Sequence, residues 1–155
     1  MKRPKITLII AEPKWRATKT LPALLKRACQ LALERADVTQ GEVTILLADD
    51  TRLHELNSLF RGKGAPTNVL SFPAAPNVTQ QLGDVAIALG VATHEAKAEG
   101  KSLVHHTTHL AVHGVLHLLG YDHIKIRDAR KMEKLEIEIL AALKIPDPYI
   151  SRKAA

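Results

Sequence analysis

The residues whose types and spacing could do chemistry lie between His113 and His123, where the chain reads H-G-V-L-H-L-L-G-Y-D-H. In a helix, His113 and His117 lie one turn apart on one face, so both imidazoles can reach a single metal ion. Gly120 can then end the helix in a left-handed conformation and bring His123 round as a third ligand. Three neutral imidazoles suit zinc and leave its fourth position open, which is typical of a catalytic site.

Two further histidines, His105 and His109, extend the same row towards the N-terminus. The row alone does not say which histidines bind metal, and packed histidines are the competing interpretation. The break at Gly120 decides, because only the pair just before it can share an ion with His123. We therefore expect His109 to face the core or to support a ligand through a hydrogen bond, rather than to bind the metal itself.

The residue after the first ligand argues against one class of zinc enzyme. The histidine spacing matches the skeleton of the metzincin proteases, which need Glu directly after the first His as general base. This chain has Gly114 there, a residue without a side chain. The adjacent carboxylate base of those proteases is therefore absent, which counts against peptide hydrolysis.

Five segments carry a family resemblance. They are L-N-S-L-F-R-G-K at 56–63, P-T-N-V-L-S-F-P at 66–73, L-G-D-V-A-I at 82–87, T-H-L-A-V-H-G-V-L-H-L-L-G-Y-D-H at 108–123 and D-P-Y at 147–149. Together they resemble the YbeY family of bacterial endoribonucleases, also called rRNA maturation factors. The resemblance implies a zinc-dependent, single-strand-specific endoribonuclease that matures the 3′ end of small-subunit rRNA and serves ribosome quality control. The implied partners are ribosomal RNA and the small ribosomal subunit.

Arg61 is the candidate catalytic residue outside the histidine segment. It opens the stretch R-G-K-G, where backbone can approach a ligand closely and a guanidinium can bind phosphate through two hydrogen bonds. By itself this pattern describes a surface arginine in a loop at least as well. The resemblance places Arg61 on the family's catalytic arginine, which favours function. Lys63 is a candidate for substrate binding, with a solvated surface charge as the equal alternative.

Two positions depart from the family pattern. Asn68 stands where the family usually has Asp, which puts in doubt any role of a carboxylate there in polarising a ligand or binding a second cation. Lys144 stands where the family often has a glycine that ends a helix, which affects only the helix cap.

Composition and charge fit one globular domain, residues 1–155, that is 46% hydrophobic and 25% charged. The net charge of +6 suits a polyanionic partner such as RNA. Residues 1–27 hold eight basic residues and one acidic residue, so the excess is an N-terminal feature that a solvated face would explain equally well. Cys29 is the only cysteine, and no apolar run approaches a membrane span. These features predict a soluble cytoplasmic protein with Cys29 packed as a small apolar residue.

Apolar runs and turn residues predict the secondary structure. Strands are expected at 5–11, 42–47, 69–72 and 84–89, with a turn at 80–83 and antiparallel pairing near it. One helix is expected to begin after Thr20, a second after Asp49 or Asp50, and a short third helix to end at Gly100. Two more helices are expected at 102–119 and at 125–143. The last of these has a buried stripe of Met132, Leu135, Ile139 and Leu143. The early strand, helix and strand imply a parallel crossover. The predicted fold is α+β (mixed α/β), a sheet of about four strands packed with helices, with the zinc site on a helix and the following turn.

Three functions remain open. The first is the zinc-dependent endoribonuclease that the resemblance implies, in which zinc-bound water or the RNA 2′-hydroxyl attacks while Arg61 stabilises charge on the phosphate. The second is a metal-dependent hydrolase of another substrate. The third is a ribosome-assembly factor whose zinc is mainly structural.

Overall fold

The computed structural model describes residues 3–61, 67–75, 81–121 and 126–150. In chain order its elements are β1 Lys5–Ile10, the 3-10 helix η1 Pro13–Ala17, α1 Leu21–Arg35, β2 Glu42–Ala48, α2 Asp50–Arg61, β3 Val69–Pro73, β4 Gln81–Ala88, α3 Leu89–Ala98, α4 Leu103–Leu118 and α5 Ile126–Ala142. In this described part, no helix is both long enough and apolar enough to cross a membrane.

The four strands form one mixed sheet in the order β1-β2-β4-β3. β1 pairs with β2 and β2 with β4 in parallel, whereas β3 pairs with β4 in the antiparallel sense. A parallel neighbour needs a crossover, which α1 supplies between β1 and β2. The predicted mixed sheet, its parallel crossover and its antiparallel pair are confirmed.

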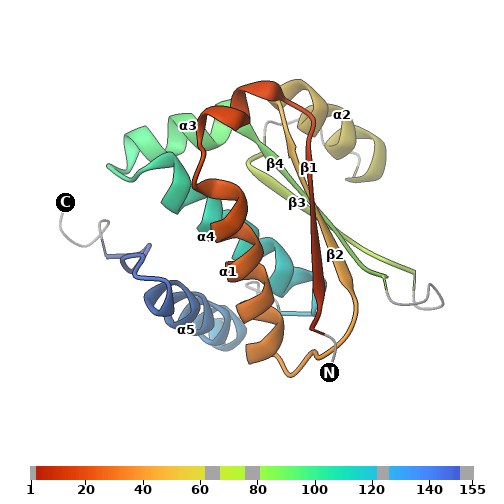
Figure 1. Cartoon of the computed structure of the whole chain (residues 1–155), viewed down its shortest axis with the longest axis vertical. Helices are drawn as coiled ribbons and strands as arrows, with labels where there is room; N and C mark the ends of the chain where they lie inside the picture. Colours follow the sequence, from red (N-terminus) through yellow and green to blue (C-terminus); the bar gives the residue numbers. More distant parts are fainter. Residues whose placement is uncertain (1–2, 62–66, 76–80, 122–125, 151–155) are drawn as a thin grey trace.

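Helices cover the two faces of the sheet unequally (Figure 1). The larger core joins α1, α4 and α5 to one face, on which Val43, Ile45 and Val85 are fully buried. A smaller core lies on the opposite face, where Leu53 of α2 packs against strand residues such as Ala86. Successive strand residues point to opposite faces, so the two cores take alternate positions along β2 and β4. Cys29 lies in the larger core, as predicted, and burial raises the pKa of its thiol to about 12.

The long helix α4 occupies the centre of this arrangement, in contact with α1, α3, α5, β3 and β4. Ser102 caps its start, where the side chain accepts a hydrogen bond of 3.0 Å from the His105 backbone N–H. At its end Gly120 has φ +97°, and the Tyr121 backbone N–H donates to the Leu116 carbonyl at 3.0 Å. These contacts form the left-handed cap predicted from Gly120. The cap ends the helix within a turn of the histidine pair.

The beginning of β4 differs from the prediction. The turn expected at 80–83 is wrong for residues 81–83, which belong to β4 and pair with β2 on one side. Gly83 suggested a turn, but it follows an irregularity in the pairing of Glu42 and Val43, and a Cβ there would lie 2.6 Å from the Phe72 carbonyl oxygen and 2.7 Å from the Leu118 side chain. The glycine therefore allows β3 and α4 to approach the strand closely and does not reverse the chain.

At two helix starts the capping interaction differs from the prediction. Thr20 precedes α1 as expected, but its side chain makes no capping hydrogen bond and its backbone is already helical. At α2 the Asp49 carboxylate accepts a hydrogen bond of 2.8 Å from the Arg52 backbone N–H. Asp49, rather than Asp50, is therefore the side chain that caps this helix.

Replacement of Lys144 tests the conformation of the chain at the end of α5. Its φ is +62°, a left-handed conformation that costs a residue with a Cβ about 1 kcal/mol or more. We expect Lys144→Gly to raise the free energy of unfolding by about 1 kcal/mol, because glycine adopts this conformation without that cost. Denaturant unfolding of the two proteins measures the difference. Lys134→Gly, an exposed change inside α5, is the matched control and should instead destabilise by about 1 kcal/mol. A loss of stability in both variants would contradict the strain at Lys144.

Candidate metal and RNA site

The predicted pair of histidines converges on α4. The Nε2 atoms of His113 and His117 lie 3.1 Å apart, and their ring centroids are 4.6 Å apart. Two nitrogens bound tetrahedrally to one zinc ion at 2.0–2.1 Å would be separated by about 3.3 Å. The two rings therefore need to move only a few tenths of an ångström to share a metal ion. This donor geometry fits the metal that the sequence predicts.

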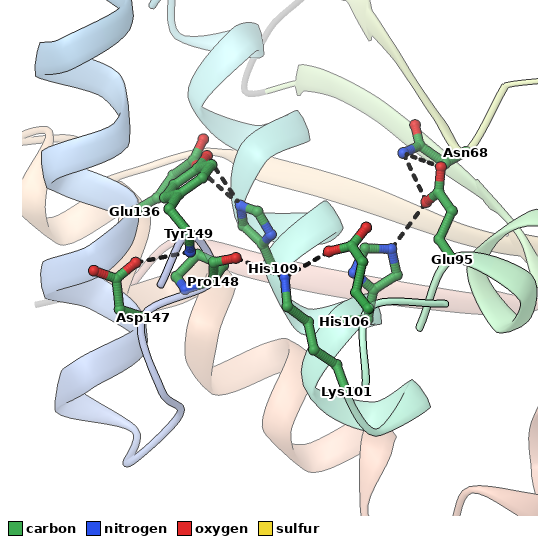
Figure 2. A network of polar contacts seen from close by, with 10 residues as sticks. Asn68, Glu95, Lys101, His106, His109, Glu136, Asp147, Pro148 and Tyr149 are labelled. Atoms are coloured by element: carbon green, nitrogen blue, oxygen red, sulfur yellow. Dashed lines mark hydrogen bonds and ion pairs between the residues drawn. The ribbon is translucent and has the colours of Figure 1, made fainter. Parts of the chain in front are cut away.

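A buried carboxylate on α5 contacts the His113 ring at the nitrogen that faces away from His117. The Glu136 side chain is fully buried, and its Oε2 lies 2.7 Å from Nδ1 of His113. Its other oxygen, Oε1, lies 2.7 Å from Nε2 of His109 and also accepts a hydrogen bond from the Tyr149 hydroxyl (Figure 2). One carboxylate thus gathers three side chains, from α4 and from the segment after α5. His109 is buried, which was one of the two predicted alternatives, and it contacts Glu136; support of a metal ligand by His109 stays a prediction.

The Glu136 carboxyl group is ionised at neutral pH in spite of its burial. Burial by itself raises its pKa, but the hydrogen bonds from His109 and His113 outweigh that effect and hold the pKa at about 2. An ionised carboxylate accepts hydrogen bonds and donates none. Each of its three neighbours must therefore be the donor.

A second polar cluster lies on the other side of His109. The Asn68 side-chain amide donates to the Glu95 carboxylate at 3.0 Å, and Nε2 of His106 lies 2.9 Å from the same oxygen (Figure 2). Asp in place of Asn68 would bring a second carboxylate against Glu95, so the amide suits this neighbour. A cavity of about 230 Å³ opens beside both clusters, with Asn68, Glu95, His106, His113 and Tyr149 in its lining.

The close approach of α4 to the sheet explains the glycine after the first histidine. A Cβ at Gly114 would lie 2.6 Å from the Val85 side chain and 3.1 Å from the Ser71 hydroxyl. The Ser71 hydroxyl also donates a hydrogen bond of 2.9 Å to the Gly114 carbonyl. No side chain fits between helix and sheet at this position, so the glutamate base of the metzincins is sterically excluded.

The other predicted site residues are not placed. His123 and Lys63 lie outside the described residues. The backbone of Arg61 forms the last residue of α2, and its side chain is outside the description. Within the ranges that the structure does describe, no three His, Cys, Asp or Glu side chains are grouped so that they could hold a metal ion. His123 as third ligand, Arg61 and Lys63 therefore stay predictions.

Sequence reasoning missed Glu136, although the chain carries a signal for it. The apolar stripe of α5 was predicted from Met132, Leu135 and Ile139, and Glu136 lies four residues after Met132 and three before Ile139. That spacing puts a charged residue on the buried face of an amphipathic helix. A buried charge is found almost only where it is paired, so the position itself pointed to partners elsewhere in the chain.

A mixed sheet crossed by a buried helix with a converging histidine pair defines the class, an α/β protein with an imidazole site at the end of its central helix. The family model described as Endoribonuclease YbeY matches residues 10–144. The chain therefore belongs to the YbeY family, as the sequence segments predicted.

Individual relatives agree with this assignment. The protein named Endoribonuclease YbeY in Rhodopseudomonas palustris is 46% identical over 155 residues, which cover 95% of this chain and 82% of the relative. That of a Chelativorans species is 45% identical over 150 residues, covering 93% and 92%. A solution structure of a Thermotoga maritima protein has a TM-score of 0.60 at 24% identity and covers 90% of this chain and 91% of its own. This last likeness concerns the fold alone.

Gly114→Ala tests the contact between α4 and the sheet. In an ordinary helix this change stabilises by about 1 kcal/mol, because alanine is the better helix former. Here the added methyl group would meet the Val85 side chain, so we expect a net loss of about 1–3 kcal/mol. Thermal and denaturant unfolding of the metal-free protein measure it. An increase in stability would show that the helix has room to move away from the sheet.

Proposed function

We propose that this chain is a zinc-dependent endoribonuclease that cuts single-stranded segments of ribosomal RNA. Its role would be maturation of the 3′ end of small-subunit rRNA and ribosome quality control, with the small ribosomal subunit as partner in the cytoplasm. The observation that carries the proposal is the 3.1 Å approach of the His113 and His117 Nε2 atoms in a chain of the YbeY family. We propose residues 1–155 as one metal-dependent hydrolase domain.

In this proposal His113, His117 and His123 hold one zinc ion through neutral imidazole nitrogens. When bound, such an ion would polarise a phosphoryl oxygen and lower the pKa of a bound water towards about 7. The protein's own contribution begins with the orientation of the two rings, because α4 is capped at both ends and packed on several sides. A rigid helix presents both nitrogens at the spacing that the metal needs.

The charged side chains of Arg61 and Lys63 would bind the substrate. The Arg61 guanidinium would form two hydrogen bonds to the scissile phosphate and stabilise the charge that develops on it, and Lys63 would contact a neighbouring phosphate. The basic N-terminal region adds a favourable field for RNA. Because the chain has no room for a carboxylate base after His113, a peptidase mechanism of the metzincin kind is disfavoured.

One experiment separates this proposal from a hydrolase of another substrate and from an assembly factor with structural zinc. The purified protein is incubated with an RNA that has single-stranded and paired segments, and separately with casein, each with and without a chelator. We expect cleavage of the single-stranded RNA segments only, lost with chelator and restored by zinc. His117→Ala should abolish cleavage and metal binding, and His105→Ala, about two turns before His113 in the same row, is the matched control that should retain both. Cleavage of casein would favour the second function, and RNA binding without cleavage the third.

Arg61→Ala tests whether the site acts on phosphate. If the guanidinium stabilises charge in the transition state, its loss should slow RNA cleavage roughly 100-fold, the effect of removing one preorganised donor. Zinc content and melting temperature should stay unchanged, and Arg61→Lys should restore only part of the rate because an ammonium group lacks the two-pronged geometry. Arg52→Ala, an exposed arginine of the same helix, is the control. Full activity in Arg61→Ala would remove Arg61 from the mechanism.

A further inference from the structure

We propose that Glu136 is a positioning residue for the metal site, and that it holds the His113 ring in the tautomer whose Nε2 lone pair faces the metal. The inference rests on the proposed function in one respect, the assignment of His113 as a ligand. It concerns a residue that neither the histidine pattern nor the family resemblance singled out. It also gives a role to the D-P-Y segment at 147–149.

The contact with Glu136 determines which nitrogen of the His113 ring carries the proton. A neutral imidazole carries one proton, on either Nδ1 or Nε2. Nδ1 lies 2.7 Å from Oε2 of Glu136, and a carboxylate placed behind a ligand histidine accepts the hydrogen bond of the ring, which puts the proton of the neutral ring on Nδ1. Nε2 is then left with its lone pair, and this is the atom that lies 3.1 Å from Nε2 of His117. The carboxylate therefore selects the form of the ring that can bind a metal.

The carboxylate of Glu136 is held in a fixed position. Both of its oxygens are engaged, Oε1 by His109 and Tyr149 and Oε2 by His113. Rotation of the group would break at least two of these hydrogen bonds, and the carboxylate is itself inaccessible to water that could replace them. The side chain is fully buried on the face of α5 that carries Met132 and Ile139. A fixed acceptor in turn fixes the orientation of the ring that donates to it.

The C-terminal segment 147–149 is attached to the same group of side chains. The Tyr149 ring packs edge-on against His109, with centroids 5.5 Å apart, while its hydroxyl reaches Glu136. Lys101, just before α4, donates a hydrogen bond of 2.6 Å to the Pro148 carbonyl, and the Tyr149 backbone N–H donates to Asp147 at 2.8 Å (Figure 2). The segment is thus held from both sides. The hydroxyl supplies the third donor that the buried carboxylate needs.

The test measures zinc affinity without RNA. Metal-free Glu136→Gln is titrated with zinc in competition with a coloured chelator at about pH 8, where imidazoles are neutral. We expect roughly 10- to 100-fold weaker binding, the usual effect of losing a partner of this kind. Glu133→Gln, an exposed change on the same helix, is the matched control and should bind as the wild type does. A loss of less than about tenfold in folded Glu136→Gln would overturn the proposal.

A second readout separates positioning from general support of the fold. In the metal-free protein with ¹⁵N-labelled histidine, the ring nitrogen shifts of His113 report which nitrogen carries the proton. We expect the Nδ1–H form in the wild type and in Glu133→Gln, and a mixture of both forms in Glu136→Gln. A merely structural role would leave this tautomer unchanged. Pure Nδ1–H in Glu136→Gln would therefore overturn the proposal.

Tyr149→Phe keeps the test decisive if Glu136→Gln does not fold. This change retains the ring against His109 and removes only the hydroxyl that donates to Glu136. We expect a loss of zinc affinity of roughly fivefold, about the value of one ordinary hydrogen bond. Affinity within twofold of the wild type would then overturn the proposal. RNA cleavage is scored separately: absent cleavage with zinc affinity that depends on Glu136 would reject only the endoribonuclease.

Discussion

The close packing of α4 against the sheet is the constraint on which the site depends. Gly114 lets the helix backbone approach Val85, and the Ser71 hydroxyl ties the Gly114 carbonyl to β3. Once that face of the helix is turned to the sheet, the positions one residue before it and three residues after it lie together on an adjacent face. These are His113 and His117. The same contact that stabilises the fold therefore decides where the imidazole pair points, and it leaves no space for a carboxylate base beside it.

Burial of Glu136 is the second constraint, and it works through polar contacts. A carboxylate without partners in this position would cost several kcal/mol, because an ionised group loses its hydration there. His109, His113 and Tyr149 replace that hydration with hydrogen bonds. Both oxygens of the carboxylate are engaged, which favours one arrangement of the group, although the buried Nδ1 of His109 has no hydrogen-bond partner among the described residues. The proposed metal site and the core thus share the same packed side chains, and a change to either affects both.

The site brings together segments that are far apart in the chain. Asn68 precedes β3, Glu95 lies on α3, Glu136 on α5 and Tyr149 in the segment after it, and all of them surround α4. The cavity beside His113 therefore exists only when the sheet, α3 and the C-terminal segment have all packed. Its lining includes the carboxylates of Glu95 and Glu99, whereas the arginine and lysine proposed for phosphate contact belong to a different segment.

Sequence by itself determined the features that depend on short-range periodicity. Alternating or continuous apolar runs gave the four strands, and helical spacing together with Gly120 gave the histidine pair and the end of α4. Tertiary structure decided whatever depends on residues that meet across the fold. Glu136 resembles a surface glutamate until α5 packs on α4, and Gln81 to Gly83 resemble a turn until β2 and β3 hold them extended. Such contacts are set by the topology of the chain, and neither local propensity nor periodicity encodes them.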